Sequence, residues 1–183
     1  NSVKAGPGGA GLVQYTLPSL AEGVAINATY ASAGENNEGS TALGLVYTGI
    51  EGLTVSLGTG NDNSKVAVDA DYTTMKASYA YSSLTVAVSS SEYDHTTAAN
   101  DQEVTSFGLT YTVTDDISVT YGQDKIENNT DTADIEVDGI TASYTSGGMT
   151  VTAKRVSADN VDGSSTGLNN DRSMFKLAAS FAF

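Results

Sequence analysis

The sequence predicts an all-β protein, an antiparallel up-and-down β-barrel that crosses a membrane. Three observations predict it: alternation of apolar and polar residues, a hairpin-sized repeat, and a last strand that ends on an aromatic residue. In residues 175–183 the three Phe and Leu177 fall on one face of an extended strand. Such a stripe is typical of a strand between lipid and a wet lumen, whereas the end of a soluble domain usually frays into water.

A short apolar motif recurs along the chain and indicates a repeat of hairpins. Its starts are spaced by 29, 31, 33 and 32 residues, at Val24, Leu53, Leu84, Ile117 and Met149. Each start follows a tight turn rich in Ser, Asp or Gly, which supply local hydrogen bonds or a positive φ. A period of this length fits two strands with one short and one long connection, rather than a helical solenoid.

The alternation places eleven strands on the chain. We expect them at residues 10–17, 24–33, 41–49, 53–60, 73–81, 84–93, 104–113, 117–126, 135–145, 149–157 and 171–183. Many approach the length of about 9–11 residues that a tilted strand needs to cross a bilayer. The apolar parity slips between Ile135 and Ile140, across Gly139, where we expect a β-bulge.

A soluble two-sheet sandwich would show the same alternation, so the faces decide between the two. The less apolar face is small and polar rather than charged, as in the wall of a lumen, and most of the ten Tyr share the apolar face. Several of these Tyr stand just before tight turns, where an aromatic girdle would meet lipid headgroups. The predicted lipid-facing girdle is Tyr15, Tyr47, Tyr81, Tyr111 and Tyr144.

Several functional classes are excluded or disfavoured. No run of about 18 apolar residues is present, which excludes a helical membrane protein. The net charge of -14 argues against nucleic acid as a partner, and the lack of Cys removes disulfides and thiolate metal sites. The lone His95 lies in an acidic loop without an organised nucleophile, and the Gly-rich residues 6–11 lack the Lys-Ser/Thr of a phosphate loop. We therefore expect no enzyme, no cofactor and no metal centre.

An odd strand number has a topological consequence. In a meander of eleven strands, the first and last point the same way and could close only by parallel pairing, whereas single-chain bacterial barrels use even antiparallel numbers. Open edges in hydrocarbon would leave unpaired N–H and C=O groups, each costing several kcal/mol. We therefore expect that further N-terminal strands complete the wall.

Residues 11–18, Gly-Leu-Val-Gln-Tyr-Thr-Leu-Pro, the hairpin repeat and the terminal Phe183 resemble the C-terminal two-thirds of a Gram-negative general porin. The alphaproteobacterial kind is nearest, and the similarity covers residues 10–183. The resemblance implies a sixteen-stranded outer-membrane barrel that assembles as a homotrimer. Residues 1–10 would then be the tail of the inward-folded loop that narrows the pore, and 11–183 would be barrel strands with their turns and loops. Phe183 matches the family's signal to the barrel-assembly machinery.

Charges give a sketch of the pore. Basic residues with lumen parity are expected to line it, and the resemblance implies that they oppose acids on the inward loop: Lys76, Lys154 and Lys176, with Arg172 near the outer rim. Short turns would face the periplasm and the longer, acidic connections the exterior. Those connections are residues 91–103, 124–138 and 159–171, either simply solvated or forming a negative vestibule. Their carboxylates suit Ca²⁺, so a loop-bound divalent cation is the one exception to the expectation of no metal centre.

The leading hypothesis is passive diffusion of small hydrophilic solutes and ions through a mildly cation-preferring pore, among outer-membrane lipid and lipopolysaccharide. Two alternatives stay open at this point. One is a substrate-specific outer-membrane channel, and the other is a soluble acidic β-rich surface protein such as an adhesin.

Overall fold

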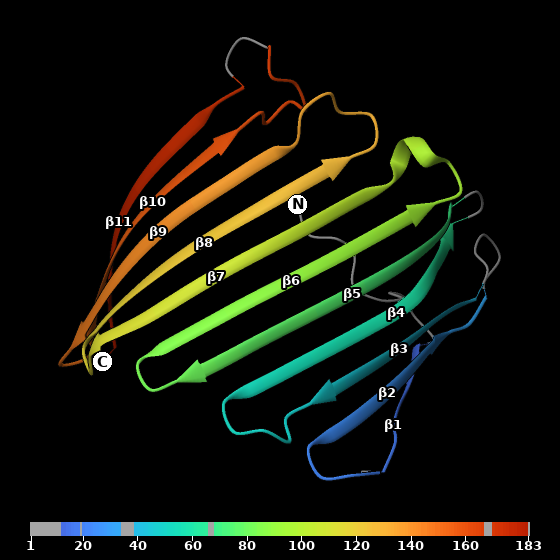
Figure 1. Ribbon diagram of the computed structural model, residues 1–183, viewed down its shortest axis with the longest axis horizontal. Helices are drawn as coiled ribbons and strands as arrows, with labels where there is room; N and C mark the ends of the chain where they lie inside the picture. Colours follow the sequence, from blue (N-terminus) through green and yellow to red (C-terminus); the bar gives the residue numbers. More distant parts are fainter. Residues whose placement is uncertain (1–11, 19, 34–38, 66–67, 167–169, 183) are drawn as a thin grey trace. The chain divides into compact units, whose positions relative to one another are not determined.

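The computed structural model describes residues 12–18, 20–33, 39–65, 68–166 and 170–182. Eleven strands follow one another in the sheet in the same order as in the chain (Figure 1). They are β1 (Leu12–Thr16), β2 (Val24–Ala31), β3 (Ser40–Tyr47), β4 (Leu53–Lys65), β5 (Val68–Tyr81), β6 (Leu84–His95), β7 (Gln102–Thr114), β8 (Ile117–Asn128), β9 (Ile135–Ser146), β10 (Met149–Asp159) and β11 (Arg172–Phe181). One 3₁₀ turn, η1 (Ala98–Asn100), lies between β6 and β7. The all-β, up-and-down prediction is confirmed.

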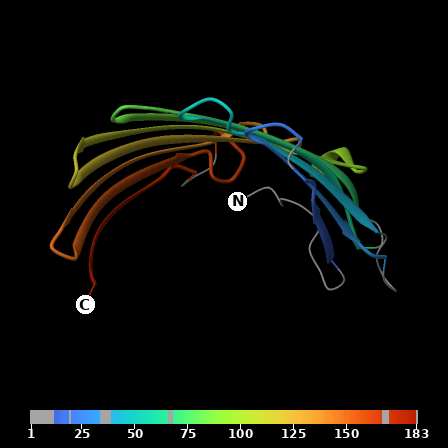
Figure 2. The ribbon, with the colours of Figure 1, turned by 90° about the horizontal axis from the view of Figure 1, so that it is seen from below.

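The chain divides into two compact units, which are described separately. Unit 1 comprises residues 1–78, 89–104 and 128–130, and unit 2 comprises residues 79–88, 105–127 and 131–183. Strands β1 to β4 pair antiparallel in unit 1, and β8 to β11 pair antiparallel in unit 2. In Figure 2 the described strands β9, β10 and β11, coloured orange to red, form one layer with no second sheet packed on them.

Tight turns fix the register of the hairpins. Gly147 and Gly148 join β9 to β10, and both have positive φ, at 57° and 81°. A two-residue hairpin of this kind needs positive φ at both positions, which glycine adopts without steric cost. The register that follows pairs Met149 with Ser146 and continues one to one as far as Asp159 and Glu136.

The expected bulge in β9 is absent, so that expectation is wrong. Gly139 pairs with Gly122 on one side and with Val156 on the other, in an uninterrupted ladder. The parity slip has another cause: Ile135 pairs with Ile126, which is buried, at the outer ends of β8 and β9. Apolar side chains occupy the polar side of the sheet there, which reverses the pattern without an extra residue.

Strands β4 and β5 run further than the expected 53–60 and 73–81. Ala70 and Tyr72, in the added part of β5, are among the few buried apolar residues. The Tyr72 ring lies over Gly60, where any Cβ would overlap it. Polar residues such as Asn61 hide the strand pattern, yet the Asn61 side chain accepts hydrogen bonds from the Thr41 backbone N–H and hydroxyl at 2.6 and 3.0 Å.

The apolar side chains do not form an interior. Of the hydrophobic residues that the structure describes, only Ala70, Tyr72 and Ile126 are buried. Tyr111 and Phe181, which a sandwich would pack between its sheets, are 49% and 60% exposed. No helix in the described residues is long and apolar enough to span a bilayer. This inside-out burial fits a membrane wall and argues against the soluble sandwich.

Candidate functional site

The polar face of the strands is lined with paired hydroxyl groups. In unit 2, Thr110 bonds Thr120 across β7 and β8 at 3.0 Å, and Thr145 bonds Thr150 across β9 and β10 at 3.0 Å. In unit 1, Thr74 and Ser91 meet at 2.8 Å across β5 and β6. Cross-strand hydroxyl pairs stabilise neighbouring strands while leaving lone pairs for water. The polar face is therefore a wettable, uncharged surface over most of its described area.

Two lysines stand directly opposite each other on this face. Lys154 of β10 is the Cα partner of Lys176 of β11, and Thr141 of β9 is its partner on the other side. Both side chains are exposed, and neither makes an ion pair with the described residues. Like charges directly across a ladder repel, so the pair concentrates positive potential at one point of the wall.

Of the other two basic residues expected in the pore, one lies beside the lysine pair and one does not. Arg172 has the same parity as Lys176 on β11 and pairs with Ala158, so three positive charges share this face of β10 and β11. Lys76 lies on β5 and has the parity of Thr74. Four strands lie between β5 and β10 in the sheet order. The structure thus groups Lys154, Lys176 and Arg172, and it leaves Lys76 out of that cluster. A role in lining the pore stays a prediction for all four.

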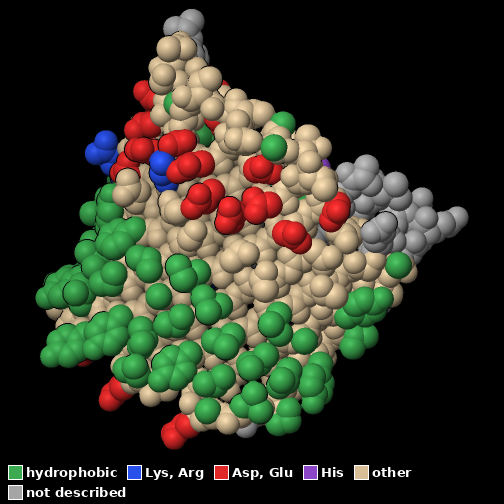
Figure 3. Space-filling view, turned by 45° about the vertical axis from the view of Figure 1, so that its right-hand side comes forward, with side chains coloured by type: hydrophobic (Ala, Val, Ile, Leu, Met, Phe, Trp, Pro, Cys, Tyr) green, Lys and Arg blue, Asp and Glu red, His purple; other side chains and the backbone are tan. Residues whose placement is uncertain are grey.

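Most of the strand-end acids lie on the opposite, apolar face. Glu136 is the cross-strand Cα partner of Lys125 on β8 and of Asp159 on β10. All three lie on the same face as Tyr121 and Tyr144. Figure 3 shows acidic side chains in a row above a broad zone of apolar ones. On the polar side of the described β8–β9 pair, Asp124 is the acid, opposite Val137. Apart from Asp124, the acids of this pair therefore lie on the side away from the hydroxyl-lined wall.

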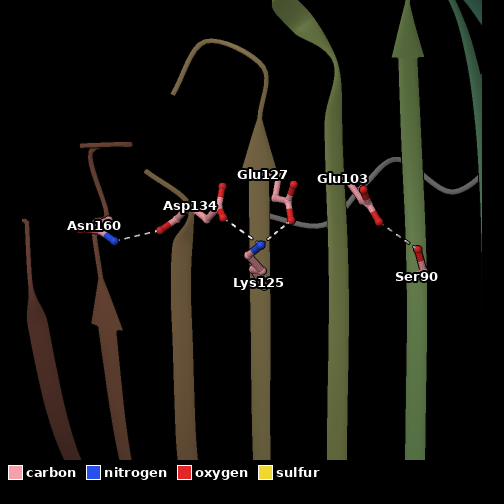
Figure 4. A network of polar contacts seen from close by, with 6 residues as sticks. All are labelled: Ser90, Glu103, Lys125, Glu127, Asp134 and Asn160. Atoms are coloured by element: carbon pink, nitrogen blue, oxygen red, sulfur yellow. Dashed lines mark hydrogen bonds and ion pairs between the residues drawn. The ribbon is translucent and has the colours of Figure 1, made fainter. Parts of the chain in front are cut away.

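One cation is inserted in the acidic row. The Lys125 Nζ lies 2.6 Å from Glu127 Oε1 and 2.8 Å from Asp134 Oδ2, so two carboxylates share one ammonium (Figure 4). The Asp134 carbonyl also accepts a hydrogen bond from Asn160 Nδ2 at 3.0 Å. This network joins the ends of β8, β9 and β10 on the apolar side.

Two outer connections of unit 2 are hydrogen-bonded to each other. The Gly163 carbonyl accepts from the backbone N–H groups of Thr132 and Ala133 at 2.8 and 3.2 Å. Gly163 itself donates to the Asn160 carbonyl, and its φ of 74° places it in the left-handed region. Asn170 is buried, and its carbonyl accepts from Val161 N–H at 2.8 Å. These contacts, here called the rim clamp, join Thr132 and Ala133 to residues 160–163 and, through Val161, to Asn170. No pattern in the sequence predicts them.

His95 has a structural role in its loop. Its Nδ1 accepts from the Thr97 backbone N–H, and its own N–H donates to Asp101 Oδ1, both at 2.8 Å. Over the residues that can be described, no group of three or more His, Cys, Asp or Glu side chains is arranged to hold a metal ion. The loop-bound divalent cation stays an expectation.

The predicted aromatic girdle is on the outside of the strands. Tyr15, Tyr81, Tyr111 and Tyr144 are exposed, and Tyr81 stacks on Tyr79 with ring centroids 6.5 Å apart. Tyr47 is half-buried because its ring lies over Gly49. Contact with lipid stays a prediction for these five. Phe183 and the loop tail at residues 1–10 lie outside the described residues.

Solved structures with the same fold include porins. A porin refined at 1.8 Å resolution matches with a TM-score of 0.70 at 18% identity, over 94% of this chain and 60% of that one. An anion-selective porin from Comamonas acidovorans matches with a TM-score of 0.65 at 15% identity, over 81% and 48%. A trimeric form of the outer-membrane protein OmpT of Vibrio cholerae matches with a TM-score of 0.60 at 20% identity, over 93% and 64%. The chain thus spans about half to two-thirds of the length of these proteins.

Sequence comparison points the same way. No curated protein sequence matches the chain. The family model described as Gram-negative porin matches residues 2–153, which is most of the chain. Together with the antiparallel strands, the exposed apolar face and the hydroxyl-lined polar face, this match identifies the chain as a member of the Gram-negative porin family, a β-barrel of the outer membrane.

Proposed function

We propose that the intact protein is a pore for passive diffusion of small hydrophilic solutes and ions across the outer membrane. The observation that carries this proposal is the segregation of the two faces: hydroxyl pairs such as Thr110–Thr120 on one side and exposed Tyr, Phe and Leu on the other. Hydroxyl-lined surfaces hydrate easily, so they favour a wet passage without any energy source or covalent step. The relatives described as porins support the same conclusion.

Ion selectivity follows from charge placement, and we propose a mild cation preference. The net charge of -14 lowers the potential around the outer ends of the strands, which concentrates cations near the mouth. Because the acids of β9 and β10 lie on the apolar face, their effect on the passage acts at longer range and weakens with salt. The preference should therefore be modest and largest at low ionic strength.

One observation favours a second candidate, a channel that prefers anionic solutes. Lys154 and Lys176 face each other on the polar side, with Arg172 on the same face. A negatively charged solute would relieve the repulsion between the two ammonium groups. The Comamonas acidovorans relative is itself described as anion-selective.

Assembly is part of the proposal. We infer a sixteen-stranded barrel in which residues 1–10 belong to the constriction loop, and a homotrimer like the trimeric OmpT form. Phe183 would serve the barrel-assembly machinery, and lipopolysaccharide would surround the outer ends of the strands.

Planar-bilayer recording of the intact protein tests the proposal. Large ohmic steps that recur in threes, with a reversal potential of cation sign in a KCl gradient, are the expected result. A reversal potential of anion sign selects the second candidate. Small currents that a single solute blocks would show a substrate-specific channel. Absence of insertion would rule out every pore hypothesis.

A further inference from the structure

An apolar groove lies on the outer surface of unit 1, on the face opposite the hydroxyl pairs. It has a volume of about 480 Å³ and is lined by Leu43, Leu45, Leu57 and Met75, with Ser90 and Glu92 at one end. All of these residues belong to β3, β4, β5 and β6 within unit 1. Its volume falls in the range of about 300–1,000 Å³ that is usual for small-molecule sites.

The pairing of the strands explains why the groove is there. Leu45 pairs with Leu57, and in the next row on the same face Leu43 pairs with Thr59. Thr73, on β5, also lines the groove. The short threonine side chains leave space between the leucines and Met75. Leu43, Leu57 and Met75 are 45–55% exposed.

In a membrane, hydrocarbon fills a groove of this kind. If water filled it instead, contact between water and the leucine and methionine side chains would cost roughly 25 cal/mol per Å² of apolar surface. A flexible acyl chain can follow the row of leucines and bring its headgroup to the Ser90–Glu92 end. Any discrimination between lipids would therefore come from the headgroup rather than from the chain.

The charge at that end is one-sided. Asp69 and Asp71 on β5, Asp94 on β6 and Glu103 on the neighbouring β7 have the parity of the groove residues. Among the side chains described in unit 1, the one Lys or Arg is Lys76, which lies on the polar face. Ser90 donates to Glu103 Oε1 at 3.5 Å (Figure 4). Glu92 is the charged residue among those that line the groove. A positively charged headgroup complements this end, whereas an anionic one is repelled.

We propose that this groove binds one acyl chain of a lipid with a cationic amine headgroup, with the ammonium at the Glu92 carboxylate. The inference rests on the outer-membrane location and goes beyond the pore function, because the groove lies on the side away from the passage. It assigns the outer face of unit 1 a preferred lipid.

The test uses the lack of Trp in this chain. Met75→Trp puts a reporter in the groove, and Tyr111→Trp puts a matched reporter on the apolar face of unit 2. The intact protein is reconstituted in phosphatidylcholine vesicles with a small, equal fraction of a bromine-labelled long-chain amine or of a long-chain sulfate with the same chain. Quenching is taken relative to the parent protein. The amine should quench the groove reporter about fivefold more effectively than the sulfate, the scale of one partly exposed ion pair, and the two should be equivalent at Tyr111→Trp.

A second substitution isolates the carboxylate. Glu92→Gln in the Met75→Trp protein should abolish the preference for the amine, while Glu136→Gln on the apolar face of unit 2 should leave it intact. Equal quenching by both lipids at the groove would overturn the proposal, and so would a sulfate preference that requires Ca²⁺. Conductance is recorded in the same preparations: loss of the amine preference with normal conductance refutes the groove alone, and absence of conductance with the preference intact refutes the pore alone.

Discussion

The two faces of the same strands carry side chains suited to opposite environments, one polar and one apolar. On β7, Leu109 belongs to the apolar side and Thr110, its neighbour, hydrogen-bonds Thr120 on the polar side. On β10, Lys154 stands on the polar side and Tyr144 of the adjoining strand on the apolar side. A displacement of one residue therefore decides whether a charge is hydrated or buried in lipid. The comparison teaches that composition averaged over a strand conceals both its environment and its function.

The largest effect is expected from placing one charge on each face. Leu109→Arg should destabilise the folded protein by about 2–4 kcal/mol, the cost of an arginine at the middle of the lipid face. Thr110→Arg should fold, because its side chain extends into water, and should lower conductance. Heat-modifiable electrophoresis and urea unfolding in detergent measure the first effect, and bilayer recording the second. Equal tolerance of both variants would show that the faces are assigned incorrectly.

A smaller loss is expected where the polar face is tightly packed. Gly60→Ala should cost about 1–3 kcal/mol, because its Cβ would overlap the Tyr72 ring and the Thr41 carbonyl. Gly44→Ala is the matched control on a neighbouring strand, where the nearest atom is the Leu57 carbonyl at 3.9 Å. Urea midpoints of the two variants give the comparison. Similar midpoints would mean that Tyr72 moves aside without cost.

The lysine pair offers a subtler test of the polar face. Lys154→Glu replaces repulsion across β10 and β11 by attraction, which should stabilise by about 0.2–1 kcal/mol. It should also move the reversal potential in a KCl gradient towards cations. Lys76→Glu, on β5, is the control for a charge of the same sign outside the cluster. If Lys76→Glu shifts the potential as much as Lys154→Glu does, the cluster has no special position in the passage.

The smallest effect is expected on the apolar side, at the outer end of β8. Lys125→Ala removes an ammonium shared by Glu127 and Asp134, but this network is exposed and screened by salt. We expect a slight decrease in the urea midpoint at low salt that disappears at high salt. A decrease that persists in high salt would mean that packing, and not charge, makes the contribution of Lys125.

Much of the fold could be predicted because period-two patterning is a local property. It places β7 and β10 within a few residues of their observed ends and puts Lys154 and Lys176 on one face. The patterning could not reveal that these lysines are direct partners, since register depends on turn geometry such as that of Gly147 and Gly148. The sequence around a residue thus specifies its face of the sheet more clearly than it specifies the residue opposite on the next strand.

Other features escaped prediction for identifiable reasons. The hairpin of β4 and β5 continues through polar residues whose partners, such as Thr41 for Asn61, are distant in the chain. The groove of unit 1 depends on four strands, and a gap left by short side chains has no pattern in a linear sequence. The face on which the acids lie could have been predicted, because without a bulge Glu136 has the same parity as Tyr144.

With the longer connections on the exterior, as expected from their length, the rim clamp would form part of the cell surface. Because the Gly163 carbonyl binds the backbone of Thr132 and Ala133, two separate stretches of chain present one continuous surface. An antibody or a phage receptor-binding protein that grips this surface would contact residues from both stretches at once. A synthetic peptide copying either stretch alone would lack half of that epitope and the hydrogen bonds that hold its shape.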